Sequence, residues 1–155
     1  MKKLYVVGNK VSKSLSPTIF NYWFKKYNIK ASYRYLELTE KNFHKKIKEV
    51  LEKKDTLGLN VTIPFKNKII KHLGKIDVHA KKIGAVNCVT NKKTINGTNT
   101  DWTGYYKTLP NIKKTKNRRV IILGYGGASH AIHYVLKKRG FKDILIFNRS
   151  KKKIK

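Results

Sequence analysis

The stretch Gly58-Leu59-Asn60-Val61-Thr62-Ile63-Pro64-Phe65-Lys66 predicts a buried strand that ends in functional side chains. Its apolar residues are typical of a strand inside a sheet, and Asn60 and Thr62 add two polar groups near its end. Pro64 suits the first position of a helix, which would place Lys66 in the first turn. Ligands of open α/β sheets bind beyond the carboxyl ends of strands. The stretch therefore predicts an α/β fold with a site at this strand end, where Lys66 is the candidate proton-transfer group.

Asp101 is the predicted partner of Lys66. It is one of only 8 acidic residues, and it follows another strand end at Asn99-Thr100. A lysine and a carboxylate within hydrogen-bond reach can hold and transfer a proton. The positive end of the predicted helix would ease proton release from Lys66, whereas the carboxylate would retain the proton, and the sequence does not decide between the two effects. A solvated lysine and a helix-capping aspartate are the structural alternatives.

Strands and helices alternate along the chain, which is typical of α/β proteins. Strands are predicted at residues 4–8, 32–38, 58–62, 85–90, 93–97, 120–123 and 144–147. Helices are predicted at residues 16–27, 39–51, 64–72, 81–84, 101–109 and 131–139. The polar segment 113–119 is typical of a linker. We therefore expect a domain boundary near residue 112.

A serine-rich loop precedes the first predicted helix. Ser12, Ser14 and Ser16 alternate before Pro17, and alternate side chains of an extended loop point the same way. Hydroxyl groups beside a helix N-terminus can hold a carboxylate, although a capped loop with incidental serines has the same pattern. Asn87 follows an apolar run and is a candidate for binding a substrate hydroxyl or for closing a turn.

The segment Gly124-Tyr125-Gly126-Gly127-Ala128 has the context of a dinucleotide-binding loop, because it follows an apolar strand and precedes a helix. Gly124 permits a tight turn, and Gly126 leaves room for a pyrophosphate at the helix N-terminus. Asn148-Arg149-Ser150 ends the next strand, where an NAD site usually has an acidic residue. Arginine can bind a 2′-phosphate, which favours NADP. A glycine-rich connection without ligand and a surface arginine are the alternatives.

The composition limits the classes of function. A formal charge of +29 permits a nucleic-acid partner. The basic residues are spread along the whole chain, however, and lysine far outnumbers the arginine that base and phosphate recognition favour. The single cysteine excludes an internal disulfide, and no Cys/His spacing indicates a metal site. No apolar run approaches the roughly 18 residues of a membrane span, so we expect a cytoplasmic protein without a membrane partner.

Seven motifs together resemble the shikimate dehydrogenase family. They are Gly8-Asn9, Ser14-Leu15-Ser16-Pro17, Asn60-Val61-Thr62-Ile63-Pro64-Phe65-Lys66, Gly84-Ala85-Val86-Asn87, Asn99-Thr100-Asp101, Gly124-Tyr125-Gly126-Gly127-Ala128 and Asn148-Arg149-Ser150. The resemblance implies a three-layer substrate-binding and catalytic domain at residues 1–112, followed at 113–155 by the first part of a Rossmann-like NADP-binding domain. It also implies NADPH-dependent reduction of 3-dehydroshikimate to shikimate in the biosynthesis of chorismate and aromatic amino acids, and it leaves a homodimer open.

The resemblance assigns a role to six of the seven motifs, all except Gly8-Asn9. Ser14 and Ser16 would bind the substrate carboxylate, and Lys66 with Asp101 would be the catalytic acid/base pair. The ring hydroxyls would be held by Asn60, Thr62, Asn87 and Asp101. The cofactor would be bound by Gly124, Gly126, Gly127, Ala128, Asn148, Arg149 and Ser150.

The chain also departs from the family pattern. Lys10 and Lys13 stand where proline and histidine are common, Cys88 replaces a threonine, and Trp102 replaces a glycine. Family members also continue well beyond residue 155, through the nicotinamide side of the pocket. Three alternatives therefore stay open: a fragment that binds shikimate or NADP without turnover, a fragment that folds poorly, and a basic nucleic-acid-binding protein. Quinate is a second candidate substrate.

Overall fold

The computed structural model describes residues 1–109 and 119–149, and a six-stranded mixed sheet forms the larger part of them. The strand order is β2-β1-β3-β5-β6-β4. The strands are β1 (Lys2–Gly8), β2 (Ala31–Glu37), β3 (Thr56–Val61), β4 (Lys75–Ile76), β5 (Cys88–Asn91) and β6 (Ile95–Thr98). β1 pairs in parallel with β2 and β3, whereas β5 is antiparallel to both β3 and β6. The sheet is therefore parallel around β1, continues through the antiparallel β5–β6 hairpin and ends at β4, which pairs in parallel with β6.

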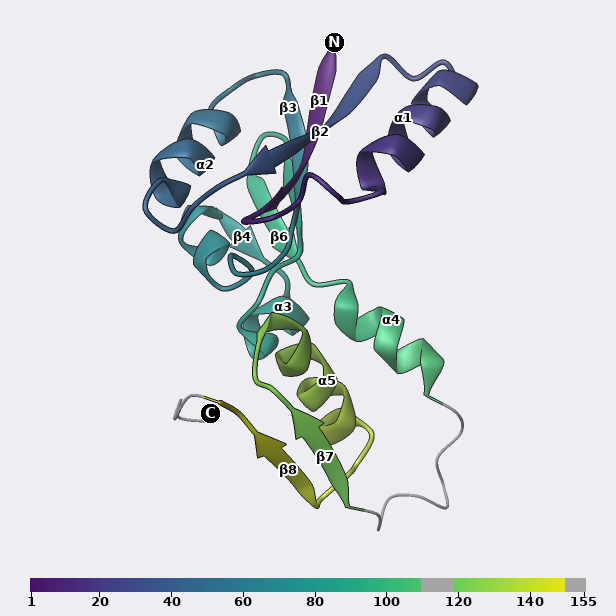
Figure 1. The fold of residues 1–155 in the computed structure, drawn as a ribbon, viewed down its shortest axis with the longest axis vertical. Helices are drawn as coiled ribbons and strands as arrows, with labels where there is room; N and C mark the ends of the chain where they lie inside the picture. Colours follow the sequence, from purple (N-terminus) through teal and green to yellow (C-terminus); the bar gives the residue numbers. More distant parts are fainter. Residues whose placement is uncertain (110–118, 150–155) are drawn as a thin grey trace.

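Helices cover both faces of this sheet, as the α/β prediction requires. Figure 1 shows α1 (Ser16–Lys26) and α2 (Phe43–Leu51) on opposite sides of it. Adjacent residues of β1 point to opposite faces. Val6 accordingly packs in the cluster that Phe20 and Phe24 of α1 join, and Val7 packs in the cluster that contains the apolar stripe of α2. The three-layer architecture is confirmed.

A second, smaller unit follows in the chain. Its elements are β7 (Val120–Leu123), α5 (Gly127–Lys138) and β8 (Ile144–Phe147), with β7 and β8 paired in parallel. α5 packs on one face of these strands through Leu136, which lies in a cluster with Ile122 and Phe141. On the opposite face four apolar side chains are exposed: Ile121, Leu123, Leu145 and Phe147. This strand-helix-strand unit is the Rossmann-like start that the sequence predicts; the expected boundary at residue 112 lies outside the described residues.

Two helices of the larger unit pack against α5. They are α3 (Val78–Ile83) and α4 (Asp101–Thr108). Trp102 of α4 lies between His79 and Tyr134, with ring centroids 4.2 and 5.9 Å away, and Ala131 of α5 packs in a cluster with Ile83. This apolar contact joins the two units and sets the glycine loop beside the end of β3. No helix within residues 1–109 and 119–149 is long and apolar enough to cross a membrane.

The helix predicted from Pro64 is wrong in its first turn. Residues 64–67 form turns, and only the short 3-10 helix η1 (Lys68–His72) follows. The backbone carbonyl of Lys66 accepts a hydrogen bond from the Val86 amide at 2.8 Å, so a distant segment takes the acceptor that a helical turn would use. Phe65 is fully buried against Phe43, with ring centroids 4.3 Å apart. Lys66 therefore does not lie in the first turn of a helix, and the predicted effect of a helix dipole on its proton release is absent at this position.

Other helix starts also differ from the prediction. α2 begins at Phe43, and Thr39 caps the turn that leads into it: Thr39 Oγ1 accepts from the Asn42 amide at 3.4 Å, and the Thr39 carbonyl accepts from the Phe43 amide at 3.0 Å. α5 begins at Gly127 instead of residue 131. Ser16 is the first residue of α1, and its hydroxyl accepts from the Ser14 hydroxyl. At Thr39 and Ser16 the polar residues that mark a helix start thus bond to neighbouring residues of the same loop.

Candidate functional site

Small-molecule sites in proteins are typically clefts of about 300–1,000 Å³. A cavity of 620 Å³ opens where the serine loop meets the end of β3. Six of the residues predicted to bind or transform a ligand line it: Ser14, Ser16, Asn60, Thr62, Lys66 and Asn87. Phe20 and Val11 supply apolar surface, and Lys10 and Lys13 add two cations at the loop. Residues that are up to 73 positions apart in the sequence thus converge on one cavity, as the motifs predict.

Lys66 and Asp101 form an ion pair at the edge of this cavity. Lys66 Nζ lies 2.7 Å from Asp101 Oδ2, and the two side chains are 13% and 30% exposed. Asn87 Nδ2 donates to the other carboxylate oxygen, Asp101 Oδ1, at 2.7 Å. Asp101 thus binds Lys66 through one carboxylate oxygen and Asn87 through the other. Charge-assisted hydrogen bonds of this length are stronger than neutral ones, and the lysine is fixed in position.

Asn99 anchors the carboxylate side of the pair. Its side chain is only 3% exposed, and its Oδ1 accepts hydrogen bonds from the amides of Asp101 and Trp102 at 3.0 and 3.3 Å. Its Nδ2 donates to the carbonyl of Ala85 at 2.9 Å. Asn99 therefore ties the start of α4 to the segment before β5. Among the predicted site residues Asn99 has no role, although its place before Thr100-Asp101 is typical of a helix cap.

The serine loop behaves only in part as the alternation predicts. Ser14 Oγ donates to Ser16 Oγ at 3.2 Å, so these two hydroxyls lie together at the cavity. Ser12 Oγ instead donates to Glu37 Oε1 at 3.3 Å, on the side of β2. The prediction that all three serines face one way is wrong, because the loop turns where the Ser14 amide bonds to the Val11 carbonyl at 2.9 Å.

Tyr33 fixes the orientation of Asn60. The Tyr33 hydroxyl donates to Asn60 Oδ1 at 2.6 Å, and the Tyr33 side chain is 2% exposed. Burial, with a smaller effect from Cys88, raises the pKa of Tyr33 to about 12. The phenol therefore stays protonated at neutral pH and remains a donor. Because the carbonyl oxygen of the amide is the acceptor, the position of the Asn60 amide nitrogen is set as well.

The glycine loop lies on the other side of Lys66. A cavity of 400 Å³ is lined by Lys66 together with Gly126, Gly127, Tyr125 and other residues, so Lys66 lines both cavities. A Cβ atom built on Gly127 would lie 3.0 Å from Lys66 Cδ and 3.1 Å from Lys66 Cβ. The stem of Lys66 thus packs directly against the loop, and only glycine leaves room for it.

The loop has the properties that a dinucleotide requires. Gly124 has φ +94°, a left-handed conformation that favours glycine. A Cβ built on Gly126 would meet no atom within 4 Å, so there is open space over the N-terminus of α5. Arg149 is exposed just after β8. These residues fit a phosphate-bearing ligand such as NADP; Ser150, the last residue of the predicted set, lies outside the described residues.

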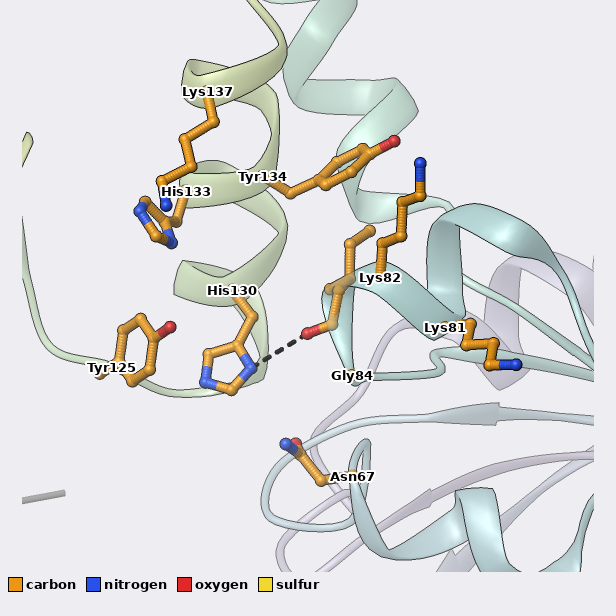
Figure 2. A pocket seen from close by; sticks show the side chains of 10 residues that line it. Asn67, Lys81, Lys82, Gly84, Tyr125, His130, His133, Tyr134 and Lys137 are labelled. Atoms are coloured by element: carbon orange, nitrogen blue, oxygen red, sulfur yellow. Dashed lines mark hydrogen bonds between the residues drawn. The ribbon is translucent and has the colours of Figure 1, made fainter. Parts of the chain in front are cut away.

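A third cavity of 540 Å³ lies between α3 and α5 and shares Asn67, Tyr125 and His130 with the glycine-loop cavity. Figure 2 shows His130 reaching from α5 toward α3, where His130 Nδ1 lies 3.2 Å from the carbonyl oxygen of Ile83. Burial, followed by the charges of Lys137 and His130, lowers the pKa of His133. His79 and His130 are thus part of the contact between the two units, because His79 Nδ1 lies 2.7 Å from the Tyr134 hydroxyl and His130 Nδ1 lies 3.2 Å from the Ile83 carbonyl. Within the described residues, no three His, Cys, Asp or Glu side chains form a metal site.

Comparison with known proteins identifies the family. A sequence model of the family described as "Shikimate dehydrogenase substrate binding domain" matches residues 6–89. The chain belongs to this family. The shikimate dehydrogenase of Thermotoga petrophila is 36% identical over 148 residues, which are 96% of this chain and 55% of that protein. The shikimate dehydrogenase (NADP(+)) of Oceanobacillus iheyensis is 38% identical over 95% of this chain and 55% of its own length.

Solved structures of shikimate dehydrogenases have the same fold. The enzyme from Aquifex aeolicus gives a TM-score of 0.84 at 36% identity, over 98% of this chain and 57% of that one. The enzyme from Thermus thermophilus, solved in complex with NADP(H) and shikimate, gives a TM-score of 0.79 at 28% identity, over 97% of this chain and 57% of that one. The chain therefore spans about half the length of the shikimate dehydrogenases it matches.

Proposed function

We propose that this chain forms the substrate-binding half, with the first part of the NADP-binding half, of an NADPH-dependent shikimate dehydrogenase. The reaction is the reduction of 3-dehydroshikimate to shikimate, a step toward chorismate and the aromatic amino acids. One observation carries the proposal: Lys66 lines both the cavity with the serines and amides and the cavity with the glycine loop. A proton donor at that position can serve a hydride transfer between ligands in the two cavities.

The 620 Å³ cavity suits a small hydroxylated carboxylate. In the proposal, the hydroxyls of Ser14 and Ser16 donate to the substrate carboxylate, and Lys10 and Lys13 add positive charge at that end. The ring hydroxyls at the other end are held by Asn60, Thr62, Asn87 and Asp101. Buried polar groups discriminate strongly against an analogue that leaves them unpaired. This division gives the ring one orientation, with its carbonyl toward Lys66.

Lys66 then acts as the general acid. As negative charge develops on the carbonyl oxygen, the ammonium donates its proton to that oxygen, which becomes the product hydroxyl. Asp101, 2.7 Å from Nζ, holds the ammonium in place during this transfer. The hydride comes from NADPH, which is the chemistry that the cofactor supplies when bound. Lys66 regains its proton from solvent before the next turnover.

The cofactor would be held by the glycine loop and the strand end after it. The amides at the start of α5 point at the space over Gly126 and can donate to a pyrophosphate. Gly124, Gly127 and Ala128 shape the same loop. Arg149 pairs with a 2′-phosphate, and Asn148 and Ser150 complete the set. This arrangement favours NADP over NAD.

The test compares Lys66→Ala with Lys46→Ala. Lys46 also pairs with a carboxylate, Glu49 at 2.9 Å, but lies on α2 and away from both cavities. NADPH consumption with 3-dehydroshikimate is expected to fall about 10²- to 10⁴-fold in Lys66→Ala, the range typical of a lost general acid. It should be unchanged in Lys46→Ala. Turnover that survives Lys66→Ala would reject the role of Lys66.

Ligand binding without turnover is the second candidate, for a chain that spans about half the length of the shikimate dehydrogenases it matches. Calorimetry with shikimate and NADP, run beside the activity assay, separates the candidates. Binding of both ligands with no NADPH consumption would establish the binding-only function.

Two further features belong to the proposal. A cytoplasmic location suits a chain with a single cysteine. A homodimer is the assembly we infer for the native chain, and light scattering at several concentrations tests it. A mass of one chain, 18.0 kDa, across that range would reject the dimer.

A further inference from the structure

One row of side chains on β2 contacts the wall of the 620 Å³ cavity from outside. Tyr33, Tyr35 and Glu37 are alternate residues, so they project from the same face of the strand. β2 is the edge strand of the sheet, and β1 lies between it and β3. None of the three residues lines the cavity. We call these three residues the β2 row.

Tyr33 reaches across β1 to the end of β3. Its hydroxyl donates to Asn60 Oδ1 at 2.6 Å. The ring of Phe20 stacks on the Tyr33 ring with centroids 4.8 Å apart, so the ring has little freedom to move. Asn60 lines the cavity. A buried and stacked tyrosine thus holds an amide that faces the cavity.

The other two members of the row hold the serine loop. The Tyr35 hydroxyl donates to the backbone carbonyl of Ser14 at 3.1 Å. Glu37 Oε1 accepts hydrogen bonds from the Val11 amide at 3.1 Å and from Ser12 Oγ at 3.3 Å. These bonds attach the loop to the edge of the sheet at both ends of its turn. The position of the Ser14 hydroxyl follows from them.

We propose that the β2 row positions two separate parts of the ligand site: Tyr33 orients the Asn60 amide, and Tyr35 with Glu37 holds the serine loop. These are positioning residues, because they touch the cavity-lining groups and not the ligand. The inference relies on the proposed function for the identity of the ligand, shikimate. The Tyr33 and Tyr35 hydroxyls bond to different segments, so removing one hydroxyl tests one part at a time.

A double-mutant cycle with shikimate affinity as the readout tests this division. Tyr33→Phe removes one hydroxyl and keeps the ring, and the loss of one such hydrogen bond corresponds to about two- to tenfold weaker binding. The same substitution should have no further effect when Asn60→Ala is already present, because Tyr33 acts through Asn60. Tyr35→Phe should couple in the same way to Ser14→Ala. The crossed pairs should be additive.

The control is Tyr22→Phe. Tyr22 lies on α1 and is 61% exposed, so its hydroxyl should not change shikimate affinity. Additive effects of Tyr33→Phe and Asn60→Ala would overturn the proposal, as would equal coupling of Tyr33 to both segments. Circular dichroism on each variant identifies any loss of fold.

A second measurement needs no ligand. In nuclear magnetic resonance spectra, the side-chain amide resonances of Asn60 should shift in Tyr33→Phe, because the donor to Asn60 Oδ1 is lost, whereas Tyr22→Phe should match the native chain. If shikimate does not bind the native chain, the proposed function fails, whereas this readout still decides the role of Tyr33. An Asn60 amide that is unchanged in Tyr33→Phe would overturn the β2-row proposal.

Discussion

Replacing Gly127 with alanine would put a methyl group against the stem of Lys66. The added Cβ would lie 3.0, 3.1 and 3.5 Å from Lys66 Cδ, Cβ and Cγ, whereas carbon atoms in contact prefer about 3.5–4.0 Å. Lys66 is held at both ends, because its Nζ pairs with Asp101 at 2.7 Å and its carbonyl accepts from the Val86 amide at 2.8 Å. The stem can therefore make room only by moving the ammonium.

The expected change in stability is small. Overpacking costs about 1–3 kcal/mol, and alanine regains up to roughly 1 kcal/mol over glycine in a helix, of which Gly127 is the first residue. The free energy of unfolding should therefore fall by about 0–3 kcal/mol, the difference of these two terms. Turnover should fall by less than the roughly 10²-fold that a misplacement near 1 Å can cost, because these contacts require the Lys66 stem to move by only a few tenths of an ångström.

The matched control is Gly126→Ala. A Cβ at Gly126 meets nothing within 4 Å, and the backbone angles of φ −95° and ψ −175° suit alanine. This variant should keep its fold and its shikimate affinity but should weaken NADP binding, because the methyl group occupies the open space over the loop. Urea unfolding, calorimetry with each ligand and NADPH consumption measure the pair. Equal effects of the two substitutions on shikimate affinity would refute the reasoning.

Three further predictions concern stability, each measured by urea unfolding. Asp77→Ala removes the cap whose Oδ1 accepts from the amides of His79 and Ala80 at 2.8 and 3.1 Å; it should cost about 1 kcal/mol, and an unchanged midpoint would contradict this. Asn99→Ala should cost about 2 kcal/mol because it leaves buried backbone groups unpaired, and a loss below that of Asp77→Ala would contradict the anchoring role. Burial and then the neighbouring His44 lower the pKa of His72, so the folded state resists protonation of this side chain. The free energy of unfolding should therefore fall as the pH is lowered below about 6.5, the usual pKa of histidine. This fall should be smaller in His72→Asn. An identical pH slope in that variant would rule out His72 as the cause.

Local sequence patterns predict most of the fold. The neighbours Val6 and Val7 enter different clusters, as strand alternation requires, and Phe43 and Ile47 form the predicted buried stripe of α2. The prediction at Lys66 fails because its carbonyl bonds to Val86. No local pattern contains a partner 20 positions away, so helix starts that depend on such bonds are not readable from the sequence.

In the candidate site, too, the sequence predicts only the features that are local along the chain. The six lining residues are marked by strand ends and by the serine motif, which are local features. The contact of Tyr33 with Asn60 crosses β1, and it can be inferred only when the strand order is known. Because Tyr33, Tyr35 and Glu37 alternate along the strand, the sequence predicts that they share one face of β2, but it does not predict which residues they bond to. Roles that depend on the order of strands are therefore found only in the structure.

The place of Lys66 between two cavities has a thermodynamic consequence. Any two ligands that touch this side chain from opposite sides share one wall, so each alters the free energy with which the other binds. Thermodynamic linkage requires each ligand to change the affinity of the other by the same factor. A titration of one ligand at several fixed concentrations of the other therefore measures a single coupling constant. Lys66 is the side chain that both cavities share in this coupling.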